Sequence, residues 1–343
     1  MPKQLVILVH GMGTYPKGNM LKEFRKALAD RATGFGISDQ AFLDKVDYQE
    51  FNYSEYFDVI RKQFAENAQA RRKGFAYLTG SGFEEKLLSQ LTSFESNFGK
   101  DEFFYTHWLD VILYSTMYFG EKVRLDFINY FEKLRRKYGH QNVHIMCHSL
   151  GTAVVHDALA KYYRTDSNPF DDIPDLRTGN FNIASLWTFA NVSRMVNLLN
   201  GLTDPMHSTV VTGNNGCTGN FVNIRHQYDP FTWFKTYDRE MDDCETLENK
   251  VFKKVNTHDF YEYVTEPTVA RAILNFIYEK TVTKAQFEKG MTDYKSGSLN
   301  REVKELKDLV DAAAKDTSIS SVKAAVAQFK MIRKKIDELS HDA

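Results

Sequence analysis

The fold of this chain is decided by the stretch Val143-His144-Ile145-Met146-Cys147-His148-Ser149-Leu150-Gly151-Thr152-Ala153. Its first half is an apolar run that predicts a strand, and the residues after it follow a helical pattern. Between them, Cys147 to Gly151 resembles the pattern G-x-S-x-G, with Cys in the first Gly position. That pattern turns sharply from strand to helix and exposes a Ser hydroxyl at the end of a sheet. The residues two before and two after the Ser must be small, because their backbones come close together. An ordinary turn that contains a Ser is the alternative.

The composition of the 343 residues sets the broad class of protein. The net charge is −1, so no broad basic field points to nucleic acid or to an anionic membrane. The three cysteines are irregularly spaced, which fits a reducing compartment and argues against a disulfide framework or a zinc site. The apolar run from Leu5 to Val9 is too short for a signal peptide or a membrane span. We therefore expect a cytoplasmic protein with no transmembrane segment.

Apolar runs that alternate with helical patterns predict the order of strands and helices. Strands are expected at 5–9, 45–53, 142–146, 183–190, 220–226 and 251–255. Helices are expected at 20–32, 108–118, 123–138, 150–163 and 268–280. This alternation predicts an α/β fold, with a mostly parallel six-stranded sheet and helices on both faces.

Two segments fall outside this alternation. Residues 54–140 form a helical insert rich in Phe and Leu, which would either cap the site or pack on the body. After Lys280, two amphipathic stretches predict a helical hairpin. We therefore expect an N-terminal domain over 1–280 and a helical extension over 281–343. Because an apolar stripe has to be buried, the hairpin would pack on the body or join a homo-oligomer.

Residues that could take part in catalysis follow four of the predicted strands. The turn His10-Gly11-Met12-Gly13 follows the first strand, and Ser149 follows the third. Asp229 follows the fifth strand, and His258 follows the sixth. The carboxyl ends of parallel strands lie at one edge of a sheet, so these residues should lie close together. Asp204 and Asp238 are rival acids, but neither directly follows a strand.

In these motifs and their order, the chain resembles the α/β-hydrolase superfamily, and most closely its compact lipase and serine-esterase branch. The resemblance implies that Ser149 is the nucleophile and His258 the general base. It implies that Asp229 orients the imidazole, and that the backbone N–H groups of Met12 and Leu150 form an oxyanion hole.

The resemblance covers roughly residues 5–280, and it leaves out 54–99 and the C-terminal hairpin. Cys147 departs from the motif, as does the turn at 188–191, where many lipases have Gly-Ser-Pro. The residues expected to line or support the site are His10, Gly11, Gly13, His148 and Gly151. The ten histidines have no metal-binding spacing, so we expect neither a metal nor a cofactor.

Other polar and aromatic residues have simpler interpretations. His144 and His226 lie in predicted strands, where core histidines with satisfied hydrogen bonds are common. His156 and Asp157 lie on the helix after Ser149 and are expected to be structural. Aromatic residues follow Asp229 and would either line an acyl pocket or simply be buried: Phe231, Trp233, Phe234 and Tyr237.

Three functions are compatible with this pattern. The first is hydrolysis of carboxylic esters through an acyl-enzyme on Ser149, and the aromatic insert favours apolar acyl chains. The second is acyl transfer to another acceptor by the same residues. The third is a hydrolase-like body without activity that serves as a binding or scaffolding module, because fold alone does not fix function. The intact set of Ser149, Asp229 and His258 argues against the third.

Overall fold

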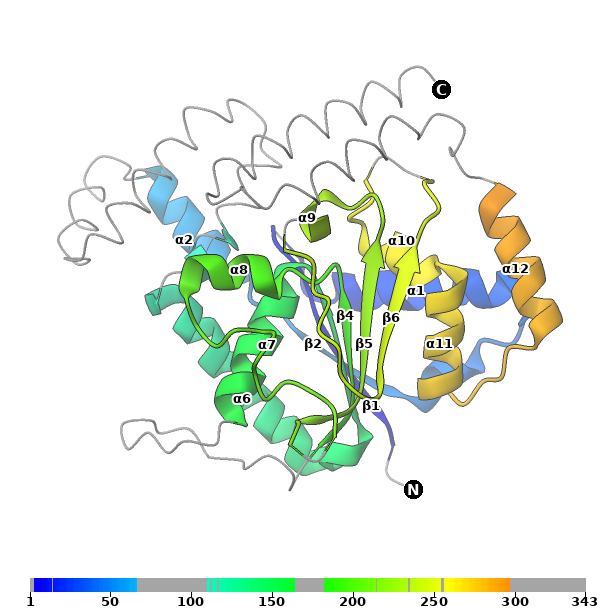
Figure 1. The fold of residues 1–343 in the computed structure, drawn as a ribbon, viewed down its shortest axis with the longest axis horizontal. Coiled ribbons are helices and arrows are strands. Elements are labelled where there is room, and N and C mark those ends of the chain that lie inside the picture. The colour runs from blue at the N-terminus through cyan, green and yellow to red at the C-terminus, as the bar shows by residue number, and fades with distance from the viewer. Residues whose placement is uncertain are drawn as a thin grey trace, which may run out of the picture.

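Six parallel strands form one open sheet in the order β2-β1-β3-β4-β5-β6 (Figure 1). The computed structural model describes residues 3–13, 15–66, 110–111, 113–115, 117–163, 182–213, 215–233, 235–253 and 256–296. The strands are β1 (Leu5–Val9), β2 (Asp47–Phe51), β3 (Val143–His148), β4 (Ile183–Phe189), β5 (Thr218–His226) and β6 (Cys244–Asn249). The predicted α/β class with a six-stranded sheet and helices on both faces is confirmed.

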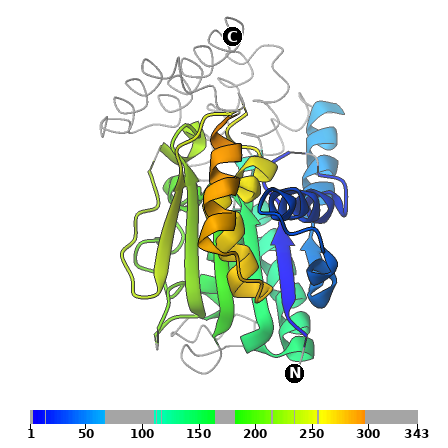
Figure 2. The ribbon, with the colours of Figure 1, turned by 90° about the vertical axis from the view of Figure 1, so that its right-hand side faces the viewer.

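Helices cover both faces of the sheet (Figure 2). One face carries α1 (Asn19–Gly34), α10 (Phe260–Thr265), α11 (Pro267–Ile277) and α12 (Lys284–Ser296). The opposite face carries α6 (Met117–Tyr138), α7 (Leu150–Tyr162) and α8 (Ser193–Asn200). The helix α2 (Ser54–Glu66) follows β2, and the short α9 (Pro230–Trp233) follows β5. Two short 3-10 helices lie at Ala41–Lys45 and His140–Asn142.

Successive residues of each strand point to opposite faces, so the sheet separates two hydrophobic cores. In β1, Ile7 and Val9 belong to the core under α6, α7 and α8. Val6 and Leu8 belong to the core under α1 and α11. All five residues of β1 are buried, which explains why this strand is an unbroken apolar run.

The predicted position of the last strand is wrong. The sixth strand is β6 at Cys244–Asn249, and Val251 to Lys253 continue as irregular chain. Because β6 pairs only with β5, it lies at the edge of the sheet and keeps polar residues exposed, so its sequence has no apolar run. Val251 and Phe252 are apolar because they are buried in the segment that leads to His258.

The predicted break between two helices near residue 120 is also wrong, because α6 runs without interruption from Met117 to Tyr138. Gly120 lies inside this helix, where an added Cβ would be 2.0 Å from the carbonyl oxygen of Tyr114. The glycine therefore accommodates a close backbone contact and does not end the helix.

The predicted insert and the C-terminal hairpin fall largely outside the described residues. These are 67–109 of the insert and everything after Ser296. Of the predicted extension 281–343, the structure describes α12, which packs against the body. Its Tyr294 hydroxyl accepts a hydrogen bond from Asn249 at 3.1 Å, and its Gly290 lies against the ring of Phe35. The domain boundary at 280 stays a prediction.

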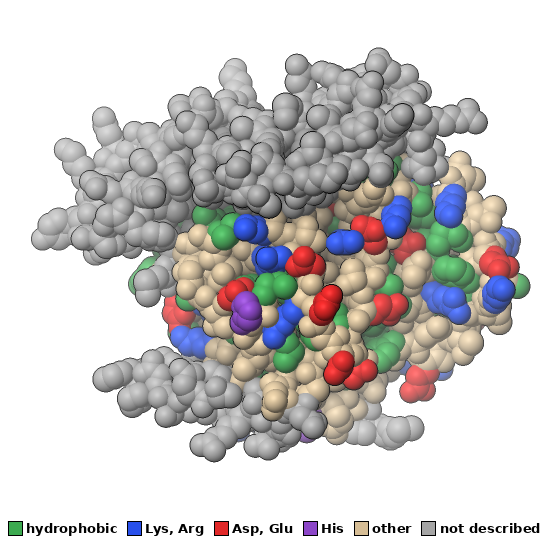
Figure 3. All heavy atoms as spheres, in the orientation of Figure 1, with side chains coloured by type: hydrophobic (Ala, Val, Ile, Leu, Met, Phe, Trp, Pro, Cys, Tyr) green, Lys and Arg blue, Asp and Glu red, His purple; other side chains and the backbone are tan. Residues whose placement is uncertain are grey.

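On the face in Figure 3, Lys and Arg side chains are interspersed with Asp and Glu, and no region of a single sign extends across it. Within the described ranges, no helix is both long enough and apolar enough to cross a bilayer.

Candidate active site

The strand order places the candidate site at the point where the chain changes direction across the sheet. From β1 the chain crosses to β2 on one side, whereas β3 lies on the other side of β1 and leads on to β4. In open parallel sheets, ligands bind outside the carboxyl ends of the strands at this point. The loop 10–13 follows β1 and Ser149 follows β3, so both lie there.

Ser149 occupies a strained turn. Its φ of 54° and ψ of −127° are unusual for a residue with a side chain, and such conformations cost about 1–3 kcal/mol. Hydrogen bonds hold the turn on both sides. The Ser149 N–H donates to the Phe189 carbonyl at 2.9 Å, and Thr152 donates to the Ser149 carbonyl from its N–H at 2.8 Å and its hydroxyl at 2.6 Å. The turn therefore presents the side chain of Ser149 between β3 and α7.

The end of β1 approaches the backbone at position 151 so closely that only glycine fits there. A Cβ at this position would lie 2.4 Å from the His10 carbonyl oxygen and 2.7 Å from that of Val9. The crowding thus comes from the end of β1, rather than from Cys147 as the motif predicts. Cys147 is buried, and burial raises the pKa of its thiol, so the thiol stays protonated.

Ser149, His258 and Asp229 form one chain of hydrogen bonds. His258 Nε2 lies 2.7 Å from Ser149 Oγ, and His258 Nδ1 lies 2.7 Å from Asp229 Oδ2. A carboxylate can only accept, so Nδ1 carries the proton and Nε2 accepts from the serine hydroxyl. All three side chains are buried. The structure thus brings together the three residues that the sequence singled out at the ends of β3, β5 and the segment after β6.

The carboxylate of Asp229 has two further donors. The Tyr263 hydroxyl donates to Oδ2 at 2.6 Å, and the Phe231 N–H donates to Oδ1 at 3.0 Å. Burial and the neighbouring Asp229 raise the pKa of Tyr263 well above its usual value, so this hydroxyl remains a donor. Sequence reasoning missed Tyr263. It lies five residues after His258 on α10, a six-residue helix too short to produce a clear pattern in the sequence.

Two rings fix the plane of the His258 imidazole. The ring centroid of Phe231 lies 4.3 Å from that of His258, and the centroid of His148 lies 4.8 Å from it. Phe231 is therefore both a buried aromatic and a wall of the site. Tyr237 packs away from the site on Phe221, at 5.5 Å between centroids. The side chains of Trp233 and Phe234 lie outside the described residues.

The glycine loop lies directly beside Ser149. A Cβ on Gly11 would be 2.8 Å from the Ser149 Cβ, so only glycine fits there without displacing the serine. Gly13 has a φ of 90°, in the left-handed region that favours glycine. Its N–H donates to Asp110 Oδ2 at 2.7 Å. Asp110 is buried and paired with Arg61; burial raises the pKa of its carboxyl to about 6, although Arg61 and the Gly13 N–H oppose that rise.

His10 supports the loop as a neutral imidazole. Burial lowers the pKa of His10 to about 4, even though its bond to Gly11 opposes that shift. The Nδ1–H donates to the Gly11 carbonyl at 2.8 Å, and Nε2 accepts from the Tyr53 N–H at 3.1 Å. The His10 ring also stacks on the Tyr53 ring at 4.2 Å between centroids. The imidazole therefore ties the loop to the end of β2.

The two predicted oxyanion donors have no acceptor in the part of the chain that the structure describes. These are the N–H groups of Met12, in the glycine loop, and Leu150, the first residue of α7. The first N–H groups of a helix have no partner within the helix, and its N-terminus favours negative charge. Both donors can therefore serve an oxyanion.

The rival acids lie elsewhere. Asp204 pairs with the exposed His207 at 2.8 Å, and Asp238 pairs with Arg194 at 2.6 Å. Neither takes the place of Asp229 beside His258.

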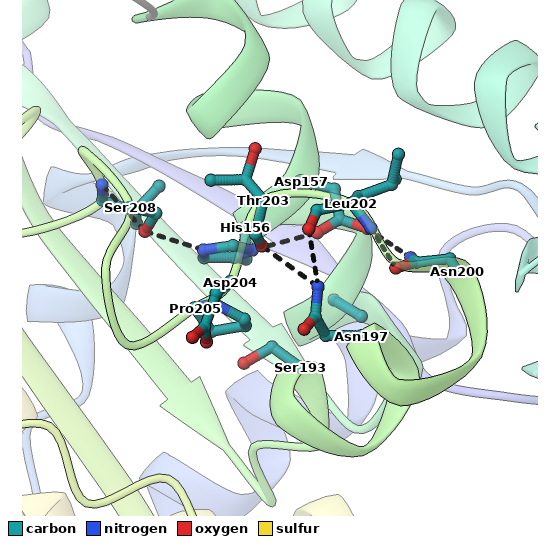
Figure 4. A network of polar contacts seen from close by, with 12 residues as sticks. His156, Asp157, Ser193, Asn197, Asn200, Leu202, Thr203, Asp204, Pro205 and Ser208 are labelled. Carbon is teal, nitrogen blue, oxygen red and sulfur yellow. Dashed lines mark hydrogen bonds and ion pairs between the residues drawn. The ribbon is translucent and has the colours of Figure 1, made fainter.

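A second Ser, His and Asp cluster is structural (Figure 4). His156 lies 3.0 Å from Asp157 and 2.9 Å from Ser208, and Asp157 also accepts from the Tyr114 hydroxyl and the Asn200 amide. Ser208 Oγ already accepts from the Val210 N–H at 3.2 Å and from Arg239 at 3.3 Å, so its own proton goes to His156. The network pins the loop after α8 onto α7.

His144 and His226 are core histidines with hydrogen-bond partners. His144 contacts the Ser185 hydroxyl at 2.7 Å, and His226 Nε2 lies 3.2 Å from the Val251 carbonyl. Burial lowers the pKa of each imidazole to about 4. Over the described ranges, no three His, Cys, Asp or Glu side chains are grouped so that they could hold a metal ion.

Comparison with models of known protein families gave no match, and comparison with curated proteins found no relative of this chain. The functional argument therefore rests on the geometry of the site.

Proposed function

We propose that this protein is a serine hydrolase of the α/β-hydrolase type that cleaves carboxylic esters through an acyl-enzyme on Ser149. The observation that carries the proposal is the chain of two 2.7 Å hydrogen bonds from Ser149 through His258 to Asp229. A serine hydroxyl is a poor nucleophile until an adjacent base takes its proton, and the base needs a partner that fixes its tautomer. In this site His258 is the base and Asp229 fixes its tautomer. The N–H of Met12 in the adjacent glycine loop is available to the oxyanion.

In the acylation step, Ser149 Oγ attacks the carbonyl carbon of the ester while its proton passes to His258 Nε2. The carbonyl π electrons move to oxygen, and the resulting oxyanion accepts hydrogen bonds from Met12 and Leu150. When the oxyanion collapses, the bond to the leaving alkoxide breaks and the imidazolium protonates it. The products of this step are the free alcohol and an ester on Ser149.

In the deacylation step, water takes the place of the alcohol. His258 removes a proton from the water as it attacks the acyl carbon. The second oxyanion collapses, the bond to Ser149 Oγ breaks, and the proton returns from His258 to the serine. Throughout both steps Asp229 stays ionised and stabilises the transient imidazolium.

The rival functions make different demands on the same residues. Acyl transfer needs the second acceptor to be something other than water, and a pure scaffold needs no polarised serine. Tyr263 and Phe231 both donate hydrogen bonds to Asp229 and hold its carboxylate beside His258. This arrangement favours a catalytic role over a scaffold without activity. Apolar acyl chains remain the proposed substrate class.

Covalent labelling with a fluorophosphonate probe tests the proposal. The probe should modify Ser149, identified by peptide mass spectrometry, and Ser149→Ala should lose both the label and p-nitrophenyl ester hydrolysis. Ser208→Ala is the matched control, because Ser208 also contacts a histidine but donates into a closed network; it should keep the label. Absence of label on Ser149 in the folded parent protein would refute the proposal. A series of p-nitrophenyl esters of increasing chain length then measures acyl preference.

A further inference from the structure

The orientation of the peptide between Gly11 and Met12 is fixed from behind. The Gly11 carbonyl oxygen accepts from the Tyr53 hydroxyl at 2.8 Å and from His10 Nδ1 at 2.8 Å. In a trans peptide, the C=O of one residue and the N–H of the next point in opposite directions, and no described peptide bond is cis. The Met12 N–H therefore points away from Tyr53 and His10.

This N–H belongs to a loop that lies against the nucleophile. A Cβ on Gly11 would be 2.8 Å from the Ser149 Cβ, so the backbone of Gly11 passes beside the serine. The Met12 N–H finds no acceptor among the described residues, as an oxyanion donor requires. Glycine, however, has little intrinsic preference between the two orientations of such a peptide. Something outside the loop must hold it.

We propose that Tyr53 is a positioning residue for oxyanion stabilisation: its hydroxyl holds the Gly11 carbonyl so that the Met12 N–H faces the reacting carbonyl of the substrate. This inference rests on the proposed function. The single hydroxyl hydrogen is shared with the His10 carbonyl at 2.9 Å, so Tyr53 contacts two successive carbonyl groups. Tyr53 does not touch substrate in this arrangement and acts only through the loop.

Asp110 clamps the next peptide in the same way. Its carboxylate accepts from the Gly13 N–H at 2.7 Å and is held in turn by Arg61. Ser54, next to Tyr53, donates its hydroxyl to the Gly13 carbonyl at 3.1 Å. The peptides on both sides of Met12 are thus fixed by buried side chains: Tyr53 and His10 hold the Gly11 carbonyl, and Asp110 holds the Gly13 N–H.

Tyr53→Phe removes one of the two donors to the Gly11 carbonyl, leaves the bond from His10, and keeps the packing in place. The Tyr53 ring stacks on His10 and meets Phe57 edge-on, and a phenyl ring keeps both contacts. One backbone donor of an oxyanion hole contributes about 10²–10³ to kcat. If the Gly11–Met12 peptide is misoriented only part of the time, only part of this contribution is lost. We expect kcat to fall about ten- to hundredfold, with KM changed less than threefold.

The decisive readout compares a p-nitrophenyl ester with its thionoester. Sulfur is larger than oxygen and a weaker acceptor, so a hole shaped for an oxyanion favours the oxo ester. Displacing the Met12 N–H should lower the oxo-to-thiono ratio of kcat/KM at least about fivefold, a part of what one donor is worth. Tyr263→Phe is the matched control: it removes a hydroxyl from the Asp229 side and should slow both esters equally. Tyr48→Phe, which loses a half-buried hydroxyl on the α1 side, controls for general destabilisation.

The outcomes separate this inference from the proposed function. If fluorophosphonate labels Ser149 but Tyr53→Phe keeps the parent ratio, the positioning role of Tyr53 is overturned and the hydrolase proposal stands. If Ser149 in the parent does not label, both are overturned. Should Tyr53→Phe fold poorly, the ratio still tests the proposal, because both esters are measured on the same preparation and the concentration of folded enzyme cancels; an unchanged ratio would again overturn the positioning role of Tyr53.

Discussion

Replacing Asp229 by Asn changes one atom and should disable the site. The aspartate accepts three hydrogen bonds: from His258 Nδ1–H at 2.7 Å, from the Tyr263 hydroxyl at 2.6 Å and from the Phe231 N–H at 3.0 Å. An asparagine has one acceptor oxygen and one donor NH₂. If its oxygen stays on Phe231, the NH₂ faces His258, which must then present an unprotonated Nδ1.

That change reverses the tautomer of the imidazole. The proton moves to His258 Nε2, which faces Ser149 and can no longer accept the hydroxyl proton. The Tyr263 hydroxyl can turn to accept from the new NH₂, so both hydrogens of the amide find an acceptor and the wrong tautomer is stable. Loss of the correct tautomer in a serine protease costs about 10⁴ in kcat, or about 5.5 kcal/mol of transition-state stabilisation. We expect a loss of similar size here, with KM nearly unchanged.

The assay is steady-state hydrolysis of a p-nitrophenyl ester, with the rate of fluorophosphonate labelling as a second measure. Asp204→Asn is the matched control, because Asp204 is an exposed acid paired with His207, and it should keep parent activity. Thermal melting should be alike for both variants. Activity of Asp229→Asn within tenfold of the parent protein would refute the tautomer argument, and a collapse in Asp204→Asn would identify a different acid.

Two more predictions concern stability. Ser149→Gly should melt higher than Ser149→Ala, because glycine relieves a φ of 54° that costs an alanine about 1–3 kcal/mol; equal melting temperatures in calorimetry would mean that the turn is unstrained. Burial lowers the pKa of His144 to about 4 in the folded chain. Between pH 6.5 and 4 this imidazole is therefore protonated in the unfolded chain and neutral in the folded chain. The free energy of unfolding of the parent, measured in urea relative to His144→Gln, should therefore fall as the pH is lowered through this window, on the order of 1 kcal/mol per pH unit; a difference that does not vary with pH would contradict the burial of a neutral imidazole.

The residues of the candidate site could be located from the sequence better than the residues that support them, Tyr53, Asp110 and Tyr263. Ser149 and the glycine loop could be located because each follows a buried strand, and the ends of parallel strands meet at one edge. His258 was located although the last strand was placed seven residues too late, at 251 in place of 244, because Val251 and Phe252, in the segment that leads to His258, are apolar and buried. The edge strand itself has too few buried positions to produce a period in the sequence.

The supports were missed for a different reason. Asp110 lies 97 residues from the Gly13 N–H that it binds, and no local pattern links the two. Tyr53 ends a predicted strand, where an aromatic residue is expected for packing alone. Tyr263 lies on a helix that sequence reasoning did not identify. Each contact depends on how the elements pack, so only the folded chain reveals it.

These three supports share one physical property that makes them testable. Each is a buried polar group with a hydrogen bond to the site, and Asp110 is also paired with Arg61 of α2. A buried hydroxyl or carboxylate costs free energy unless it is paired, so each is only as stable as the site group that it binds. Packing of Tyr53 and Tyr263 depends on their rings, whereas the geometry of the site depends on their hydroxyls. Replacing either tyrosine by phenylalanine therefore separates the stability of the fold from the positioning of the site.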